Sequence, residues 1–236
     1  MSEHAFVAGA TGYTGQAVVA ELRKRGVKTT AHVRPDSSSM ARWTDRFEGL
    51  GAAVDTTAWE LDAMTATLTA LQPTVVFALL GTTRRRAASE GMDGNAGYER
   101  IDYGLSKLLL DGCHSAAPQA RFVYLSSLGV KEGTRNPYLS ARARVERDLR
   151  DSGQPFTVAR PSFISGPDRD EDRRAERAGA AVADAVLAAA GWLGATRTRD
   201  RFASMDAATL ASGLVRAAFD PTAKGAVLEA DALRAD

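Results

Sequence analysis

The sequence predicts an α/β fold, in which helices cover both faces of a doubly wound and mainly parallel sheet. Apolar runs of strand length alternate with segments of helical spacing, a pattern typical of βαβ units. The run at 75–80 is apolar throughout, as expected of a strand buried on both faces. A glycine-rich segment at 9–15 joins the first apolar run to the first helical segment, which is how many such sheets begin.

The strands are predicted from short apolar or β-branched runs. Proline at positions 35 and 161 ends the second and sixth of them, because proline has no amide hydrogen for a ladder. Crossover helices between successive strands make right-handed, parallel connections the expected ones. The expected strands are residues 5–8, 29–33, 52–56, 75–80, 121–125, 156–159 and 226–229.

The helices are predicted where apolar residues recur at helical spacing. The segment at 98–116 is the longest of them, and the one at 139–151 carries many charges on its outer face. A dense run of charges at 167–177 is expected to loop over the top of the sheet, where it could serve as a lid. The expected helices are residues 16–22, 40–50, 64–71, 98–116, 139–151, 178–193 and 206–219.

Length and composition favour one globular domain. The 236 residues are 44% hydrophobic, which suits a single domain at 1–236, with a cofactor-binding core at about 1–160 and a substrate-side region at about 161–236. The charges of the 30 basic and 29 acidic residues nearly cancel, so the net charge gives no indication of nucleic-acid binding. One cysteine, Cys113, and three scattered histidines give no disulfide and no metal site.

The chain is expected to be cytoplasmic. Residues 1–4 are short and polar, so they do not read as a secretory signal. The apolar stretch at 180–195 is too short and too rich in alanine to span a bilayer. We therefore expect no membrane partner.

The segment 9–15, GATGYTG, carries the most specific signal. Its glycines have the spacing G-x-x-G-x-x-G between a strand and a helix, where free amides and the helix dipole favour a phosphate. The segment predicts a dinucleotide site, and a turn that binds nothing is the alternative. The predicted contacts are Gly9, Thr11, Gly12, Tyr13, Thr14 and Gly15.

Arg34 stands at the end of the second predicted strand. In dinucleotide folds this position meets the adenosine ribose, and an acidic residue there favours NAD, whereas a basic residue pairs with the 2′-phosphate of NADP. Arg34 therefore favours NADP(H), while NAD(H) is possible. A solvent-exposed arginine without a ligand is the alternative.

The chain resembles the short-chain dehydrogenase/reductase superfamily, and within it the atypical branch of NmrA-like and Tat-interacting-protein-like reductases. The resemblance runs over nearly the whole chain, and its first and fourth segments are the most informative. It is carried by GATGYTG at 9–15, LGTTR at 80–84, LSS at 125–127, YLSAR at 138–142, RPS at 160–162 and SMD at 204–206.

The resemblance implies a set of catalytic residues. Tyr138 stands where the family has the proton donor to a carbonyl, and Ser127, rather than Ser126, where it has the serine that holds the carbonyl oxygen. Arg142 replaces the family's lysine, which holds the nicotinamide ribose, and Asp102 stands in place of an asparagine that supports the proton relay. Both replacements keep coenzyme binding possible but put proton transfer in question.

The resemblance also implies coenzyme contacts beyond the glycine segment. Leu80, Gly81 and Thr82 follow the fourth strand, and Pro161 and Ser162 line the nicotinamide pocket after the sixth. The basic run at 84–86 is expected in a solvated loop, with an anion contact as the alternative.

Taken together, these residues predict an NADP(H)-dependent oxidoreductase of a small carbonyl compound. A coenzyme sensor without turnover is the first alternative, and an epimerase or isomerase that recycles its nicotinamide is the second. The predicted partner is a small-molecule substrate. A homodimer through the helices at 98–116 and 139–151 is possible.

Overall fold

A computed structural model describes residues 3–89, 91–162, 164 and 204–234 of the chain. Within these residues one seven-stranded sheet has the order β3-β2-β1-β4-β5-β6-β7, and every neighbouring pair is parallel. This confirms the predicted doubly wound α/β fold. The strands are β1 (His4–Ala8), β2 (Lys28–His32), β3 (Ala53–Asp55), β4 (Val75–Ala78), β5 (Arg121–Leu125), β6 (Phe156–Arg160) and β7 (Ala226–Glu229).

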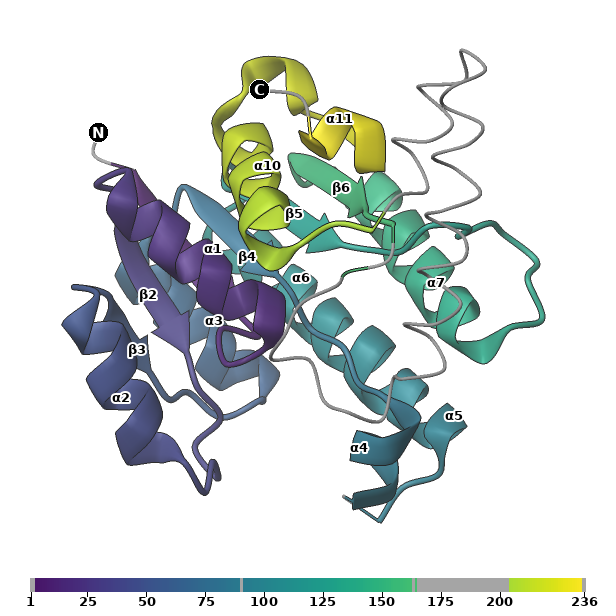
Figure 1. Cartoon of the computed structure of the whole chain (residues 1–236), viewed down its shortest axis with the longest axis horizontal. Helices are drawn as coiled ribbons and strands as arrows, with labels where there is room; N and C mark the ends of the chain where they lie inside the picture. The colour runs from purple at the N-terminus through teal and green to yellow at the C-terminus, as the bar shows by residue number, and fades with distance from the viewer. Residues whose placement is uncertain (1–2, 90, 163, 165–203, 235–236) are drawn as a thin grey trace.

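Helices cover both faces of the sheet, and each face has its own hydrophobic cluster (Figure 1). One face packs against α1 (Tyr13–Lys24), α2 (Met40–Gly49), α10 (Ala207–Phe219) and α11 (Ala230–Arg234). The other face packs against α3 (Leu61–Leu71), α6 (Ser106–Ala116) and α7 (Pro137–Asp151).

Side chains of the central strands alternate between the two clusters. In β5, Val123 packs on the α1 side, whereas Phe122 and Tyr124 pack on the side of α6 and α7. This alternation follows from the two-residue period of a strand, and it explains why the central strands are apolar throughout. It also places the phenol of Tyr124 beneath α7.

The helix expected at 98–116 starts earlier and changes character along its length. α5 (Gly94–Gly97) begins it, and Asp93 caps α5 by accepting from the amides of Asn95 and Ala96. A π-helix, η1 (Tyr98–Leu105), follows and leads into α6. The widened turns of η1 bury one residue completely, Asp102, which lies on the side of α7.

The basic run at 84–86 is not in a loop, so that expectation was wrong. It forms the start of α4 (Arg84–Ser89), in which the amide of Ala87 donates to the carbonyl of Thr83. Arginine and alanine are both good helix formers. Ala87 is buried, so α4 packs against the rest of the protein at this residue.

The C-terminal part joins the sheet and its core. β7 pairs with β6, and α10 packs along α1; a 3-10 turn, η3 (Pro221–Ala223), links α10 to β7. These elements come from the region at 161–236 that was expected on the substrate side. The loop at 167–177 and the helix at 178–193 lie outside the described residues.

Candidate functional site

A cavity of about 590 Å³ opens at the carboxyl ends of β1 and β4. These strands are neighbours, but the chain leaves them toward opposite sides, so they form the topological switch point of the sheet. In open α/β sheets the ligand binds at this point. The cavity is lined by Gly9, Thr11, Gly12, His32, Arg34, Pro35, Asp36, Ala58, Trp59, Leu79, Leu80, Gly81, Met92, Arg100, Ile101 and Leu105.

The loop after β1 needs its glycines. Gly9 has a φ of +79°, and a Cβ on it would lie 2.5 Å from the carbonyl oxygen of Leu79. A Cβ on Gly15 would lie 2.1 Å from the carbonyl oxygen of Gly9, so α1 packs directly on the turn. Gly12 is the N-cap of α1 and has no side chain to cap the helix amides. The loop is thus a cradle whose helix end favours an anion.

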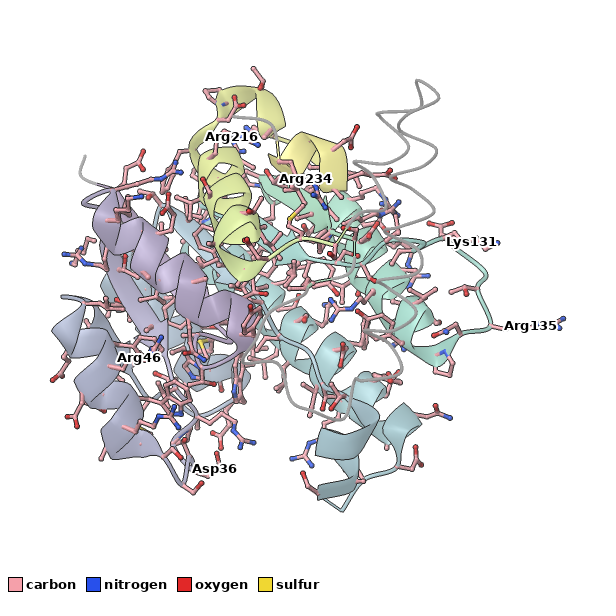
Figure 2. All side chains as sticks on the ribbon, in the orientation of Figure 1. Asp36, Arg46, Lys131, Arg135, Arg216 and Arg234 are labelled. Atoms are coloured by element: carbon pink, nitrogen blue, oxygen red, sulfur yellow. The ribbon has the colours of Figure 1, made fainter. Side chains whose placement is uncertain are left out.

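Two opposite charges, those of Arg34 and Asp36, lie together at the end of the cavity beyond β2. Arg34 is 43% exposed and its Nε lies 3.6 Å from Oδ1 of Asp36, which is 75% exposed. Figure 2 shows Asp36 in the segment between β2 and α2. Asp36 lies beyond the end of β2 and was not among the predicted site residues.

His32 and Trp59 line the cavity beside Arg34 and pack against each other. The Nε2 atom of His32 lies 2.8 Å from the carbonyl oxygen of Thr57, and its ring packs edge-on to Trp59 at 4.7 Å between centroids. Burial lowers the pKa of His32, although the Thr57 carbonyl and Asp55 oppose this shift. Two aromatic side chains in edge-on contact thus line the cavity beside Arg34.

Sequence reasoning missed the wall that η1 and the earlier residue Met92 contribute to the cavity. Met92, Arg100, Ile101 and Leu105 line it. Ile101 and Leu105 have the spacing of a helix face, and that spacing was the one available signal. Both residues lie in the π-helix η1, whose wider turns change the direction in which each side chain points.

Tyr138 stands in the first turn of α7. Asn136 caps this helix by accepting from the amide of Leu139 at 3.2 Å, and Pro137 occupies the first helical position. The Tyr138 ring is half-buried and packs 5.4 Å from the ring of Tyr98. The backbone of Tyr138 is therefore held by a capped helix turn, while one side of its ring remains partly exposed.

The two candidate serines differ in their surroundings. Ser126 is buried, and its hydroxyl donates to Oε1 of Glu146 at 2.6 Å. Glu146 is also held by Arg160 at 2.6 Å. Ser127 is half-buried, and within the part of the chain that the structure describes its hydroxyl makes one long contact, 3.4 Å to the carbonyl of Leu128. Ser127 is therefore the more available hydroxyl.

Arg142 is buried behind the cavity and does not line it. Its side chain is 7% exposed, and its Nη2 lies 2.9 Å from Oδ1 of Asp102. Its guanidinium also donates to the carbonyl of Leu125 and, at 3.5 Å, to that of Leu80. The guanidinium carbon lies 4.8 Å from the centre of the Tyr138 ring.

The charges of Asp102 and Arg142 depend on each other. Burial raises the pKa of the Asp102 carboxyl, while Arg142 and the amide of Thr82 oppose that rise. Burial alone would lower the pKa of Arg142, but attraction to Tyr138, Tyr124 and Asp102 raises it. Arg142 therefore stays a cation.

The structure brings together only part of the predicted coenzyme set. Six predicted residues line the cavity, namely Gly9, Thr11, Gly12, Arg34, Leu80 and Gly81. Tyr13, Thr14 and Gly15 belong to the helix start behind the loop, and the Thr82 amide turns to Asp102. Pro161 and Ser162 follow β6 and are not among the described residues that line the cavity.

A glycine cradle at the switch point of a parallel sheet defines a dinucleotide-binding protein of the Rossmann class. A family model described as NAD(P)H-binding matches residues 9–190, and the chain belongs to this family. The expected resemblance to the short-chain dehydrogenase/reductase superfamily is thereby confirmed.

The relatives are distant. Protein fmp52, mitochondrial, is 28% identical over 177 residues in Aspergillus fumigatus, covering 72% of this chain and 70% of that protein. The Aspergillus clavatus protein of the same name is 32% identical over 127 residues and covers 52% of this chain. The chain spans about half of that relative's length, 49%.

Among solved structures, UDP-glucose 4-epimerase from Brucella ovis in complex with NAD has a TM-score of 0.65. It is 17% identical, and the match covers 96% of this chain and 76% of the epimerase. At this identity the likeness shows the shared fold. Among the described residues, none of the helices is long and apolar enough to cross a bilayer.

Proposed function

We propose that the protein is an NADP(H)-dependent oxidoreductase that acts on a small carbonyl or related compound. The observation that carries the proposal is the cavity at the switch point, with the glycine cradle at one end and Arg34 at the other. Gly9 and Gly15 let the loop and α1 pack closely, because a Cβ on either would collide with backbone. Gly12, the N-cap of α1, leaves the helix amides uncapped by a side chain, where a diphosphate would be favoured.

In this proposal the reduced nicotinamide would supply a hydride to the carbonyl carbon. Tyr138 gives the proton of its hydroxyl to the carbonyl oxygen, and Ser127 holds that oxygen by donating a hydrogen bond. The product is an alcohol, and the proton is replaced from water. Arg142 supports the phenol through its charge, 4.8 Å from the ring centre, and does not touch the substrate.

A coenzyme sensor without turnover is the second candidate, and one observation favours it. The cation that replaces the family's lysine is buried in an ion pair with Asp102 and does not line the coenzyme cavity. Such a protein would bind coenzyme through the same cradle and would respond to its redox state.

Tyr138→Phe separates the two candidates. We expect the purified protein to bind NADPH and to oxidise it with a panel of small aldehydes and ketones. In Tyr138→Phe, NADPH binding should persist, whereas turnover should fall about 100-fold or more, because general acid catalysis is lost. Binding without turnover in both proteins supports the sensor, and no binding of either coenzyme rejects both.

Location and assembly are further proposals. We propose a cytoplasmic protein that pairs with a second copy through η1, α6 and α7. Fractionation of cells that express the chain tests its location, and light scattering of the purified protein tests the pairing.

A further inference from the structure

Two buried side chains join the ends of β4 and β5. Arg142, from α7, donates to the carbonyls of Leu80 after β4 and Leu125 at the end of β5. Asp102, from η1, accepts from Arg142 at 2.9 Å through one oxygen and from the amide of Thr82 at 2.9 Å through the other. The segment Leu80–Thr82 is therefore held from both of its ends.

The ion pair lies directly behind the cavity wall. A Cβ on Gly81 would lie 2.8 Å from Nη2 of Arg142 and 3.4 Å from Oδ1 of Asp102. Leu80 and Gly81 themselves line the cavity. The backbone at Gly81 thus has the cavity on one side and the guanidinium against the other.

The same guanidinium also contacts the candidate acid. It lies 4.8 Å from the ring centre of Tyr138, within the range of a cation–π contact. Displacement of Arg142 would therefore disturb two contacts together, the one with the Tyr138 ring and the one with the Leu80 carbonyl in the cavity wall.

Stability alone does not account for this arrangement. A buried ion pair stabilises a fold little compared with well-packed apolar residues, because both charges lose their hydration. Within the described residues, Nε of Arg142 and the hydroxyl of the nearby Tyr124 are buried without a hydrogen-bond partner. The energetically unfavourable polar cluster therefore lies between the cavity wall at Leu80–Thr82 and the candidate acid Tyr138.

We propose that Arg142 and Asp102 form a positioning pair, which fixes the coenzyme-facing segment Leu80–Thr82 relative to Tyr138. This inference rests on the proposed coenzyme function. It assigns Arg142 a role behind the wall, different from the direct ribose contact that the sequence predicted. Arg142 is then a positioning residue, and its effect on coenzyme passes through the backbone at Gly81.

Gly81→Ala tests the proposal without removing a charge. The new methyl group pushes the guanidinium away, and Gly81 needs no positive φ, so the fold should survive. We expect calorimetry to show about tenfold weaker NADPH binding, equivalent to about 1.4 kcal/mol, in a protein that is still folded at the temperature of the titration. Gly49→Ala in α2 is the matched control, because a Cβ there meets nothing within 4 Å.

A second variant shows whether the effect passes through Arg142. Arg142→Lys keeps the charge but is smaller, so it relieves the clash with Ala at position 81. The double variant should therefore bind NADPH better than the product of the two single effects predicts. Additive losses, or an unchanged affinity in Gly81→Ala, overturn the positioning role. Failure of the wild-type protein to bind NADPH overturns the proposed function as well.

Turnover provides a further readout. Displacement of Arg142 should raise the KM for NADPH and also lower kcat, because Tyr138 loses its support. A change in KM alone contradicts the link to Tyr138.

Discussion

Arg34 and Asp36 carry opposite charges and line the same end of the cavity. The arginine would attract the 2′-phosphate of NADP, whereas the carboxylate would repel it and could accept the ribose hydroxyls of NAD. The two side chains lie 3.6 Å apart, so each also weakens the field of the other. We therefore expect both residues to affect the preference between the two coenzymes.

Arg34→Ala should reduce NADPH affinity about tenfold or more and leave NADH affinity nearly unchanged, because only NADPH carries the extra phosphate. Asp36→Ala should strengthen NADPH binding. Calorimetric titration with both coenzymes measures these effects. Arg46→Ala, on the exposed side of α2 in Figure 2, is the control. Equal losses for both coenzymes in Arg34→Ala would contradict the assignment.

Asp102 and Arg142 account for each other. Each departs from the residue expected by family resemblance, and the structure shows that they are partners, 2.9 Å apart. Arginine keeps the positive charge of the lysine that it replaces, so Asp102 is the change that gives this buried cation a counter-charge.

Asp102→Asn should therefore destabilise the protein strongly. The change keeps the shape of the side chain but leaves the buried Arg142 without a counter-charge, which costs about 3–5 kcal/mol. Urea unfolding measures the loss. Asp111→Asn is the matched control, since Asp111 pairs with Lys107 on the surface of α6 and should cost less than about 1 kcal/mol. Similar losses in both variants would contradict this account.

Among the elements, strands and regular helices could be predicted from the sequence. Burial on both faces leaves an apolar run such as 75–80, and one buried helix face leaves apolar residues at helical spacing. The coenzyme cradle was predictable for a similar reason, because Gly9 and Gly15 have no tolerable substitute at their positions.

The π-helix η1 could not be predicted. Its wider turns are held by contacts that form only in the folded chain, among them those of Asp102 with Arg142 and Thr82. The cavity wall of Met92, Arg100, Ile101 and Leu105 depends on this helix and was missed with it. Asp36 was missed because its importance comes from its distance to Arg34, which no sequence pattern encodes.

For the molecule as a whole, two buried histidines link stability to pH. Nε2 of His4 lies 2.9 Å from the hydroxyl of Thr30, and Nε2 of His32 lies 2.8 Å from the carbonyl of Thr57. Burial lowers the pKa of both below the ordinary value of 6.5. As pH falls below 6.5, the unfolded chain therefore binds protons that the folded chain does not.

The free energy of unfolding should thus be lower at about pH 5.5 than at about pH 7.5. Urea unfolding at both values measures the difference. His4→Gln should reduce it, and His114→Gln, at an exposed position, should leave it unchanged. An equal pH effect in all three proteins would show that other groups are responsible.

The place of β1 in the middle of the sheet has a consequence for synthesis. The strand at His4–Ala8 is synthesised before its partner β4, which begins at Val75. At about 5–20 residues per second, that partner follows roughly 4–14 s later. During this interval, the edge of β1 that pairs with β4 in the folded protein has no neighbouring strand.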